Sequence, residues 1–296
     1  MCTAIEYHLL KMLLRWAPVL GIFAAATAGS SGAEPRGARE VFQGGLIRVD
    51  GAPPAAVSAT LALPKIKAVR LFPGADGLRH GLVPIVYNAP PGPTVLEFHD
   101  EAGEVLEKWP VVVRRSGFPV QNIRASRAMK QLKAAPGEVE KMRALHDSVT
   151  EVRRWEDAFT APVQHCVNSP FGVTRLHNGK PSGNYHRGLD QASPAGEPIH
   201  AAASGVVRVA EMFNLHGGTV GLDHGQGLTS HYLHMSKILV AEGQLVKQGE
   251  VIGEVGATGF ATGPHLHWGV YLFAVPVNPR VLVSGLKGCG GGGRKR

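Results

Sequence analysis

The sequence predicts a mainly β protein in which a helical connector joins two β domains. Glycine and proline are frequent, with 38 and 21 in 296 residues, and they divide much of the chain into short β-type runs. Helix-forming residues dominate residues 124–158. Ten of the 14 histidines fall between His165 and His267, in the second β region. A chain of this length is sufficient for two compact domains, each with its own core.

Residues 1–33 have the three regions of a secretory signal peptide. Lys11 and Arg15 precede an apolar run over residues 16–28, and small residues follow it. The run is shorter than the roughly 20 residues of a membrane-spanning helix. We therefore expect an exported protein of the periplasm, the cell envelope or the extracellular space, with no stable membrane anchor after signal cleavage. An uncleaved N-terminal anchor is the alternative.

Residues 40–118 predict an accessory domain similar to a small antiparallel β-sandwich. Six β-type runs, from "VFQGGLIRVDG" to "EVLEKWPVVVRR", are separated by Pro, Gly and Asp at regular spacing. The segment contains no cluster of histidine and aspartate. We therefore interpret it as a binding or spacing module.

Residues 124–158 predict the helical connector. Val139, Met142, Leu145 and Val149 recur at steps of three and four, which is the pattern of one apolar helix face. The Pro-Gly pair at residues 136–137 divides the segment into two expected helices.

Residues 160–283 predict the second β domain, followed by a flexible, Gly-rich basic tail over residues 284–296. Only Cys166 and Cys289 remain after signal cleavage, and exported proteins can form disulfides. A Cys166–Cys289 bridge is therefore a candidate, with two unpaired thiols as the alternative. Two cysteines cannot form a Cys-based zinc site, so any metal site must use His, Asp or Glu.

The formal net charge of +8 would favour contact with anionic surfaces, including lipid headgroups, nucleic acid and cell-wall polymers. No nucleic-acid-binding motif accompanies the charge, and only 6% of the residues are aromatic. We therefore expect no nucleic-acid partner. Charge that serves solubility alone explains the same excess.

Two short histidine motifs place metal-binding side chains on common faces. In "HRGLD", His186 and Asp190 are four residues apart and share one face of an extended strand. Gly188 favours the extended conformation because glycine weakens helices. In "HLH", His265 and His267 are two residues apart and share a strand face in the same way.

A third motif, "HYLHMS", supplies two more histidines. His231 and His234 are three residues apart, so they face opposite ways in a regular strand, and at most one is expected to join the same site. Catalytic zinc typically takes three protein ligands and keeps a fourth position open. His186, Asp190 and one histidine of "HLH" could be these ligands. The other histidine of "HLH" and His234 could then move protons or stabilise an oxyanion.

These motifs resemble those of the lysostaphin/LytM-type zinc metalloendopeptidases. That family has H-x-x-x-D and H-x-H with a further histidine between them, and here they appear in order as "HRGLD", "YLHMS" and "HLH". Neighbouring segments such as "FGVTR" and "GATGFATGP" match as well, so the resemblance covers about residues 168–280. Met235 stands where leucine is usual, which is a soft apolar exchange.

The resemblance implies roles that the spacing leaves open. It implies a compact antiparallel β domain with a groove over one sheet and one Zn²⁺ per chain. The implied zinc ligands are His186, Asp190 and His267. The implied catalytic residues beside the substrate carbonyl are His234 and His265.

The sequence therefore predicts an exported zinc metalloendopeptidase that hydrolyses peptide bonds in the cross-links or stems of bacterial peptidoglycan. Arg175 and Asn184 are expected to contact substrate or frame the site. Wall-remodelling proteins are possible partners. A non-catalytic cell-wall-binding module, or an activator of wall amidases, is the alternative, and it fits the accessory domain and the basic charge. A structural zinc domain in an adhesin is a third interpretation.

Overall fold

The structure is a computed structural model that describes residues 37–63, 66–123, 126, 131–156, 158–177 and 179–289. The predicted signal peptide, residues 1–33, and residues 290–296 of the predicted tail lie outside the described residues. Within the described ranges, no helix has the length and apolar character that a bilayer span requires.

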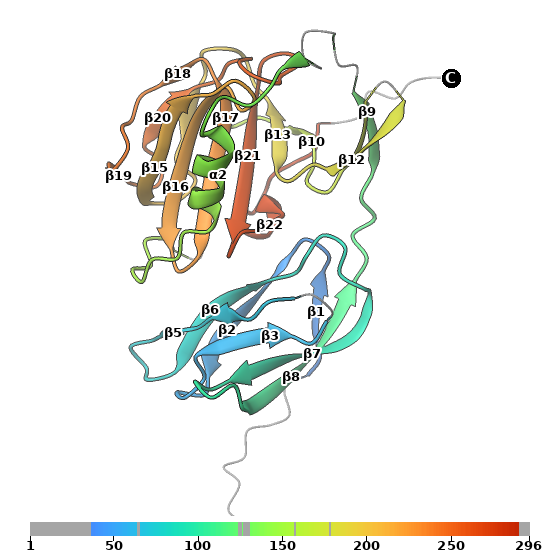
Figure 1. Ribbon diagram of the computed structural model, residues 1–296, viewed down its shortest axis with the longest axis vertical. Helices are drawn as coiled ribbons and strands as arrows, with labels where there is room; N and C mark the ends of the chain where they lie inside the picture. The colour runs from blue at the N-terminus through green and yellow to red at the C-terminus, as the bar shows by residue number, and fades with distance from the viewer. Residues whose placement is uncertain are drawn as a thin grey trace, which may run out of the picture. The chain divides into compact units, whose positions relative to one another are not determined.

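The accessory domain consists of two facing sheets, as predicted (Figure 1). Its core lies between them and includes Val49, Leu96, Phe98 and Trp109. The five-stranded sheet has the order β1 (Arg39–Phe42), β8 (Val105–Arg114), β7 (Gly92–His99), β3 (Ser58–Leu61), β4 (Val69–Arg70). The three-stranded sheet has the order β2 (Leu46–Ala52), β6 (Arg79–Pro84), β5 (Phe72–Pro73). β1 pairs with β8 in parallel, whereas the sequence predicted a purely antiparallel domain.

The second domain is built on an eight-stranded sheet that is antiparallel throughout. Its order is β10 (Val167–Ser169), β13 (Leu189–Ala192), β21 (His265–Leu272), β17 (Leu228–Met235), β16 (Gly218–Gly225), β15 (Gly205–Met212), β19 (Leu245–Val246), with β22 (Val275–Val277) beside β21. A three-stranded sheet of β14 (Pro198–His200), β20 (Val251–Glu254) and β18 (Lys237–Ile238) accompanies it. A short 3₁₀ helix, η1 (Pro279–Val281), follows β22.

The second domain begins earlier in the chain than its predicted boundary at residue 160. β9 (Val120–Ile123) pairs in parallel with β11 (Thr174–His177), which pairs in turn with β12 (Lys180–Tyr185). Trp155 and Phe159 are buried in the core of the second domain. Trp155, which was predicted to belong to the connector, is therefore a structural part of the second domain.

The connector contains one described helix, α2 (Glu138–His146), which packs against β15, β16 and β17. Met142 and Leu145 are buried on it, as predicted. Val139 and Val149 are 45% and 41% exposed, so their predicted place on the apolar face is wrong. The helix ends at His146, which leaves Val149 outside it. Its first residue, Glu138, is buried although it is charged. The other expected helix lies mostly outside the described residues.

Glu138 attaches α2 to the loop between β15 and β16. Its buried carboxylate accepts hydrogen bonds from the backbone N–H groups of Leu215 and His216, at 3.0 and 2.9 Å, and from His216 Nδ1 at 2.5 Å. Burial raises the pKa of Glu138, but hydrogen bonds from the backbone of Ala135 and from His216 outweigh it and lower this pKa below its ordinary value. The carboxylate is therefore charged and fixes α2 on the sheet.

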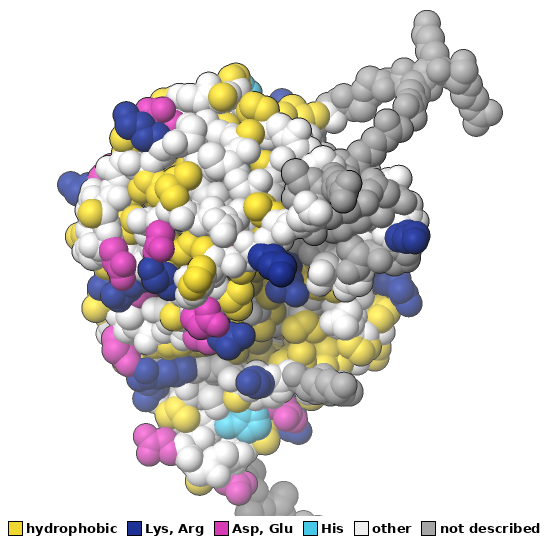
Figure 2. All heavy atoms as spheres, turned by 45° about the horizontal axis from the view of Figure 1, so that its top comes forward, with side chains coloured by type: hydrophobic (Ala, Val, Ile, Leu, Met, Phe, Trp, Pro, Cys, Tyr) yellow, Lys and Arg dark blue, Asp and Glu magenta, His cyan; other side chains and the backbone are white. Residues whose placement is uncertain are grey.

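Charged side chains of both signs lie interspersed on the face of the molecule in Figure 2. Lysine and arginine do not form one continuous basic surface there. The arrangement on this face fits a solubility role for the chain's net charge of +8. Recognition of an anion would therefore require a defined site.

The end of the described chain is held against β10. Cys166 and Cys289 form a disulfide. Cys289 N donates to Val167 O, and Val167 N donates to Lys287 O, both at 2.9 Å. Residues 287–289 therefore lie alongside β10. The expectation that they belong to a flexible tail is wrong.

Replacing both Cys166 and Cys289 by serine is expected to lower the free energy of unfolding by about 2–4 kcal/mol. The bridge joins residues 123 apart in the sequence, so its loss frees a long loop in the unfolded chain. Denaturant unfolding of the variant and of the wild type, with and without reductant, measures the effect. Wild type in reductant should match the variant, whereas equal midpoints in all samples would show that the bridge does not stabilise the fold.

Candidate metal centre

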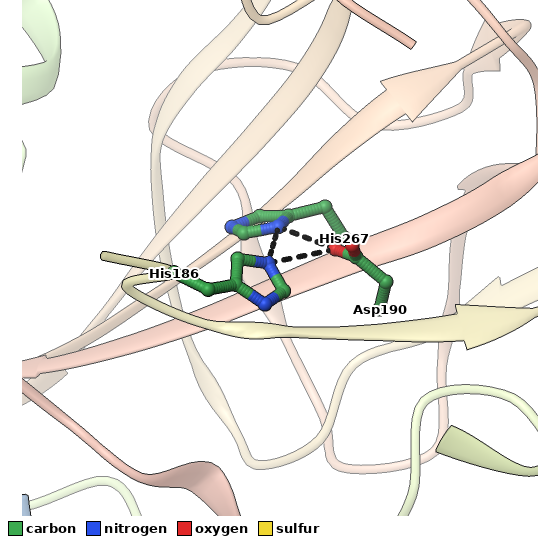
Figure 3. A group of neighbouring side chains, drawn as sticks. All are labelled: His186, Asp190 and His267. Carbon is green, nitrogen blue, oxygen red and sulfur yellow. Dashed lines mark hydrogen bonds and ion pairs between the residues drawn. The ribbon is translucent and has the colours of Figure 1, made fainter. Parts of the chain in front are cut away.

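His186, Asp190 and His267 converge on one point (Figure 3). Antiparallel pairing of β13 with β21 places Asp190 directly opposite His267, and His186 directly follows β12. Asp190 Oδ1 lies 2.9 Å from His186 Nε2 and 2.8 Å from His267 Nδ1, and the two nitrogens are 3.0 Å apart. We name these three residues the triad.

The donor set of the triad fits a zinc ion. Ligand atoms 2.0–2.2 Å from a tetrahedral zinc lie about 3.3–3.6 Å from one another, a few tenths of an ångström more than the 2.8–3.0 Å in the triad. His186 Nδ1 lies 3.0 Å from Pro170 O, which fixes its proton there and leaves the Nε2 lone pair toward the triad. Burial raises the pKa of Asp190, but the adjacent His186 and His267 hold this pKa well below its usual range, so the carboxylate is charged. Burial lowers the pKa of His267 to about 4, so its ring is neutral at pH 7, as a metal ligand must be.

Gly188 has a steric role that the sequence did not reveal. A Cβ at this position would lie 2.5 Å from Trp268 O and 2.8 Å from His267 Nε2. The glycine in "HRGLD" therefore allows the segment that carries His186 and Asp190 to approach the strand that carries His267.

Arg175 contacts the triad itself. Its Nη2 donates to Asp190 Oδ2 at 3.1 Å, while Oδ1 of the same carboxylate faces the two histidines. The guanidinium group thus orients the carboxylate. The sequence suggested that Arg175 contacts substrate or frames the site, and this geometry favours the framing role.

Replacing Arg175 with glutamine is expected to weaken metal binding about 10- to 100-fold, as loss of a partner that orients a metal ligand typically does. Competition with a chromogenic chelator measures the metal affinity. Arg208→Gln is a matched control, because Arg208 Nη2 donates to the buried Asp223 at 3.2 Å outside the triad. Unchanged affinity in the Arg175 variant, or an equal loss in both variants, would contradict this role.

His234 and His265 lie beside the triad and are oriented in the same way. His234 Nδ1 is 2.8 Å from Thr258 O, and His265 Nδ1 is 2.8 Å from Gly263 O. Each Nδ1 therefore holds its proton on a carbonyl, which leaves Nε2 as the acceptor. The two ring centroids are 4.9 Å apart, and His265 Nε2 lies 3.9 Å from Asp190 Oδ1. Burial, with the charges of His265 and His267, lowers the pKa of His234 to about 3.

His231 and His234 both lie close to His267, but only His234 lines the cavity that contains His265, so the expectation that at most one of them joins the site stays a prediction. Their rings lie 5.5 and 6.2 Å from the ring of His267. His234 has a φ of 65°, and the pairing of β16 with β17 shifts register between residues 218 and 220. This irregularity breaks the alternation of side chains that a regular strand would impose.

Two residues that belong to none of the sequence motifs, Gln121 and His146, lie near the site. His146, the last residue of α2, lies with its Nε2 3.0 Å from His231 Nδ1 and stacks on Tyr271 with ring centroids 3.6 Å apart. Gln121 on β9 accepts a hydrogen bond from Ser169 Oγ at 3.0 Å, and that Oγ is 3.2 Å from His186 Nδ1. Both reach the site through long-range packing, which short sequence motifs do not encode.

Two cavities flank the triad. The first, of about 310 Å³, is lined by Gln121, Asn168, Ser169, Arg175, Asp190, His234, Phe260, Thr262, Gly263, Pro264, His265 and His267. The second, of about 510 Å³, lies beside α2, and its lining includes Arg143, His146, Arg175, Arg187 and His267. Arg175 and His267 line both, so the cavities meet at the triad. Asn184 is exposed on β12 and belongs to neither lining, although it was expected to contact substrate or frame the site.

Comparison with known proteins now bears on this geometry. Residues 184–279 match the model of peptidase family M23. A crystal structure from Pseudomonas aeruginosa that is assigned to peptidase M23 superposes with a TM-score of 0.59 at 30% sequence identity, covering 82% of this chain and 94% of that one. This chain belongs to peptidase family M23. The M23 match contains all five predicted metal and catalytic positions. Four of them lie on strands β13, β17 and β21, and His186 lies just before β13.

Two curated relatives carry endopeptidase names, and one of these names specifies peptidoglycan. The peptidoglycan DD-endopeptidase ShyC of Vibrio cholerae is 40% identical over 116 residues, which are 39% of this chain and 27% of that protein. The DD-carboxypeptidase/endopeptidase Mpg of Neisseria meningitidis is 42% identical over 113 residues, 38% of this chain and 26% of that protein. The chain thus spans about a quarter of the length of these relatives.

Proposed function

We propose that this protein is an exported zinc endopeptidase that hydrolyses peptide bonds in the cross-links or stems of peptidoglycan. The observation that carries the proposal is the triad with the Nε2 atoms of His234 and His265 left as acceptors beside it. The name of the curated relative ShyC, a peptidoglycan DD-endopeptidase, supports the substrate. The predicted signal peptide supports export.

Zinc is the metal that best suits two imidazoles and one carboxylate with an open fourth position, and it would polarise the scissile carbonyl and acidify water. His186 and His267 would bind it as neutral rings, and Asp190, held by Arg175, would supply the charge. His186 and Asp190 are buried, which strengthens charge interactions at the triad.

His234 and His265 would carry the proton. An Nε2 with a free lone pair can accept a proton from the attacking water, since Nδ1 already donates to a backbone carbonyl. The ring that has gained this proton can then donate it to the leaving amine. Before that transfer, the Nε2–H of the same ring can donate a hydrogen bond to the oxygen that becomes negative. A non-catalytic wall-binding module would have no need of two histidines oriented in this way.

The direct test is hydrolysis of a synthetic cross-linked peptide by purified residues 34–296. A chelator should abolish cleavage, and one equivalent of zinc should restore it. Cleavage that persists in the chelator after the metal has been shown to leave would contradict a zinc peptidase.

A further inference from the structure

We propose that the cavity beside α2 binds a free carboxylate of the substrate, so that the enzyme prefers acidic peptides to the same peptides with amidated carboxyl groups. This inference rests on the proposed peptidase function. It specifies that the substrate carries a negative charge, and it names the residues that would bind this charge. We name this space the arginine cavity, after Arg143, Arg175 and Arg187 in its lining.

The arginine cavity is continuous with the triad. His186 and His267 line it, and its volume of about 510 Å³ is sufficient for a few residues of a peptide. A chain bound at the triad therefore has to run through it on one side of the bond to be cleaved. The cavity on the other side has neutral polar groups such as Gln121, Asn168 and Thr262 in its lining.

The charges that line the arginine cavity are unequal. Three arginines line it, against one acidic residue, Asp147. Arg175 is paired with Asp190. Among the described residues, neither Arg143 nor Arg187 has a carboxylate within 4.0 Å. Two guanidinium groups thus face the cavity without a carboxylate partner.

Arg187 lies beside aromatic residues. Its Cζ lies 5.8 Å from the ring centroid of Tyr185, and that ring stacks on Tyr87 with centroids 3.9 Å apart. Burial raises the pKa of Tyr271, another lining residue, to about 12, so its hydroxyl stays a neutral donor. A planar guanidinium beside a neutral hydroxyl matches the two oxygens of a carboxylate.

Arg143 belongs to the lining of the same cavity. It lies on α2, which Glu138 fixes to the sheet, and it is exposed to solvent at the cavity. Burial together with the charges of His216 and Arg187 lowers the pKa of His146 to about 3, so this lining histidine adds little positive charge. The attraction for an anion therefore comes from Arg143 and Arg187.

The test uses two synthetic cross-linked peptides that differ only in their free carboxyl groups, which are primary amides in the second peptide. We expect the zinc-loaded enzyme to cleave the acidic peptide with a kcat/KM about tenfold higher. Binding of both peptides, with a dye label, is also measured by anisotropy on zinc-loaded His234→Ala protein, where slow cleavage does not interfere. The same ratio is expected in Kd, and it should shrink at high salt.

The variant Arg143→Gln/Arg187→Gln should bring both ratios to about one. Arg115→Gln/Lys247→Gln makes the same change in net charge at exposed positions that line neither cavity, and it should keep the tenfold preference. The control matters because zinc itself attracts carboxylates. A preference that survives in the double arginine variant would therefore overturn the inference.

The two proposals fail in different ways. Equal cleavage and equal binding of both peptides by the wild type would overturn the carboxylate site and leave the peptidase intact. Absence of cleavage with a tenfold binding preference that depends on Arg143 and Arg187 would support the carboxylate site and contradict the peptidase.

Discussion

Replacing His267 with alanine is expected to abolish metal binding and peptide cleavage together. His267 Nδ1 lies within 3.0 Å of both other members of the triad, so its loss leaves two protein ligands where catalytic zinc takes three. Without the metal, the carbonyl loses polarisation worth several kcal/mol, and the rate should fall at least about 1,000-fold. Elemental analysis of the dialysed protein, together with a peptide cleavage assay, measures both effects.

The matched control for this variant is His200→Ala. His200 lies on β14 and belongs to neither cavity lining. The control should keep one zinc per chain and the wild-type rate. A His267→Ala protein that still binds stoichiometric zinc with wild-type affinity would show that the ligand assignment is wrong.

Replacing His234 with alanine is expected to preserve the metal and remove most of the rate. His234 is outside the triad, and its Nδ1 is held by Thr258 O, so the ring serves the reaction through Nε2. Loss of a proton-transfer group typically costs about 100- to 10,000-fold in rate. Zinc content and kcat measured on the same sample distinguish this variant from His267→Ala.

Asparagine at position 234 provides a second check on the His234 result. His234 has a φ of 65°, which asparagine tolerates better than alanine does. If both variants bind zinc and both lose the rate, the loss is chemical and not a consequence of backbone strain. A wild-type rate in either variant would remove His234 from the mechanism.

The grouping of the triad residues was partly predictable, because local spacing on strands brings their side chains together. His265 and His267 share a face of β21 because side chains alternate along a strand, and the pairing of β13 with β21 then brings Asp190 opposite His267. The spacing left open which histidine of "HLH" completes the triad. The family resemblance named His267, and the structure places His267 there.

Other features of the site depend on interactions that no short motif contains. The turn of His234 toward the triad requires a left-handed backbone within β17, whereas the alternation rule assumes a regular strand. Gln121 and His146 reach the site because β9 joins β11 and because Glu138 fixes α2 on the sheet. Helical periodicity could not show that α2 ends at His146 and leaves Val149 exposed.

Digestion of isolated peptidoglycan sacculi tests the central claim most directly. Purified residues 34–296 with one equivalent of zinc, and His267→Ala in parallel, are incubated with sacculi, and the soluble products are analysed by mass spectrometry. New free amines in the stem or cross-link peptides, present with the wild type and absent with the variant, are the expected result, and they identify the bond that is cut. Sacculi that release no peptide products from zinc-loaded wild type would contradict a peptidoglycan endopeptidase.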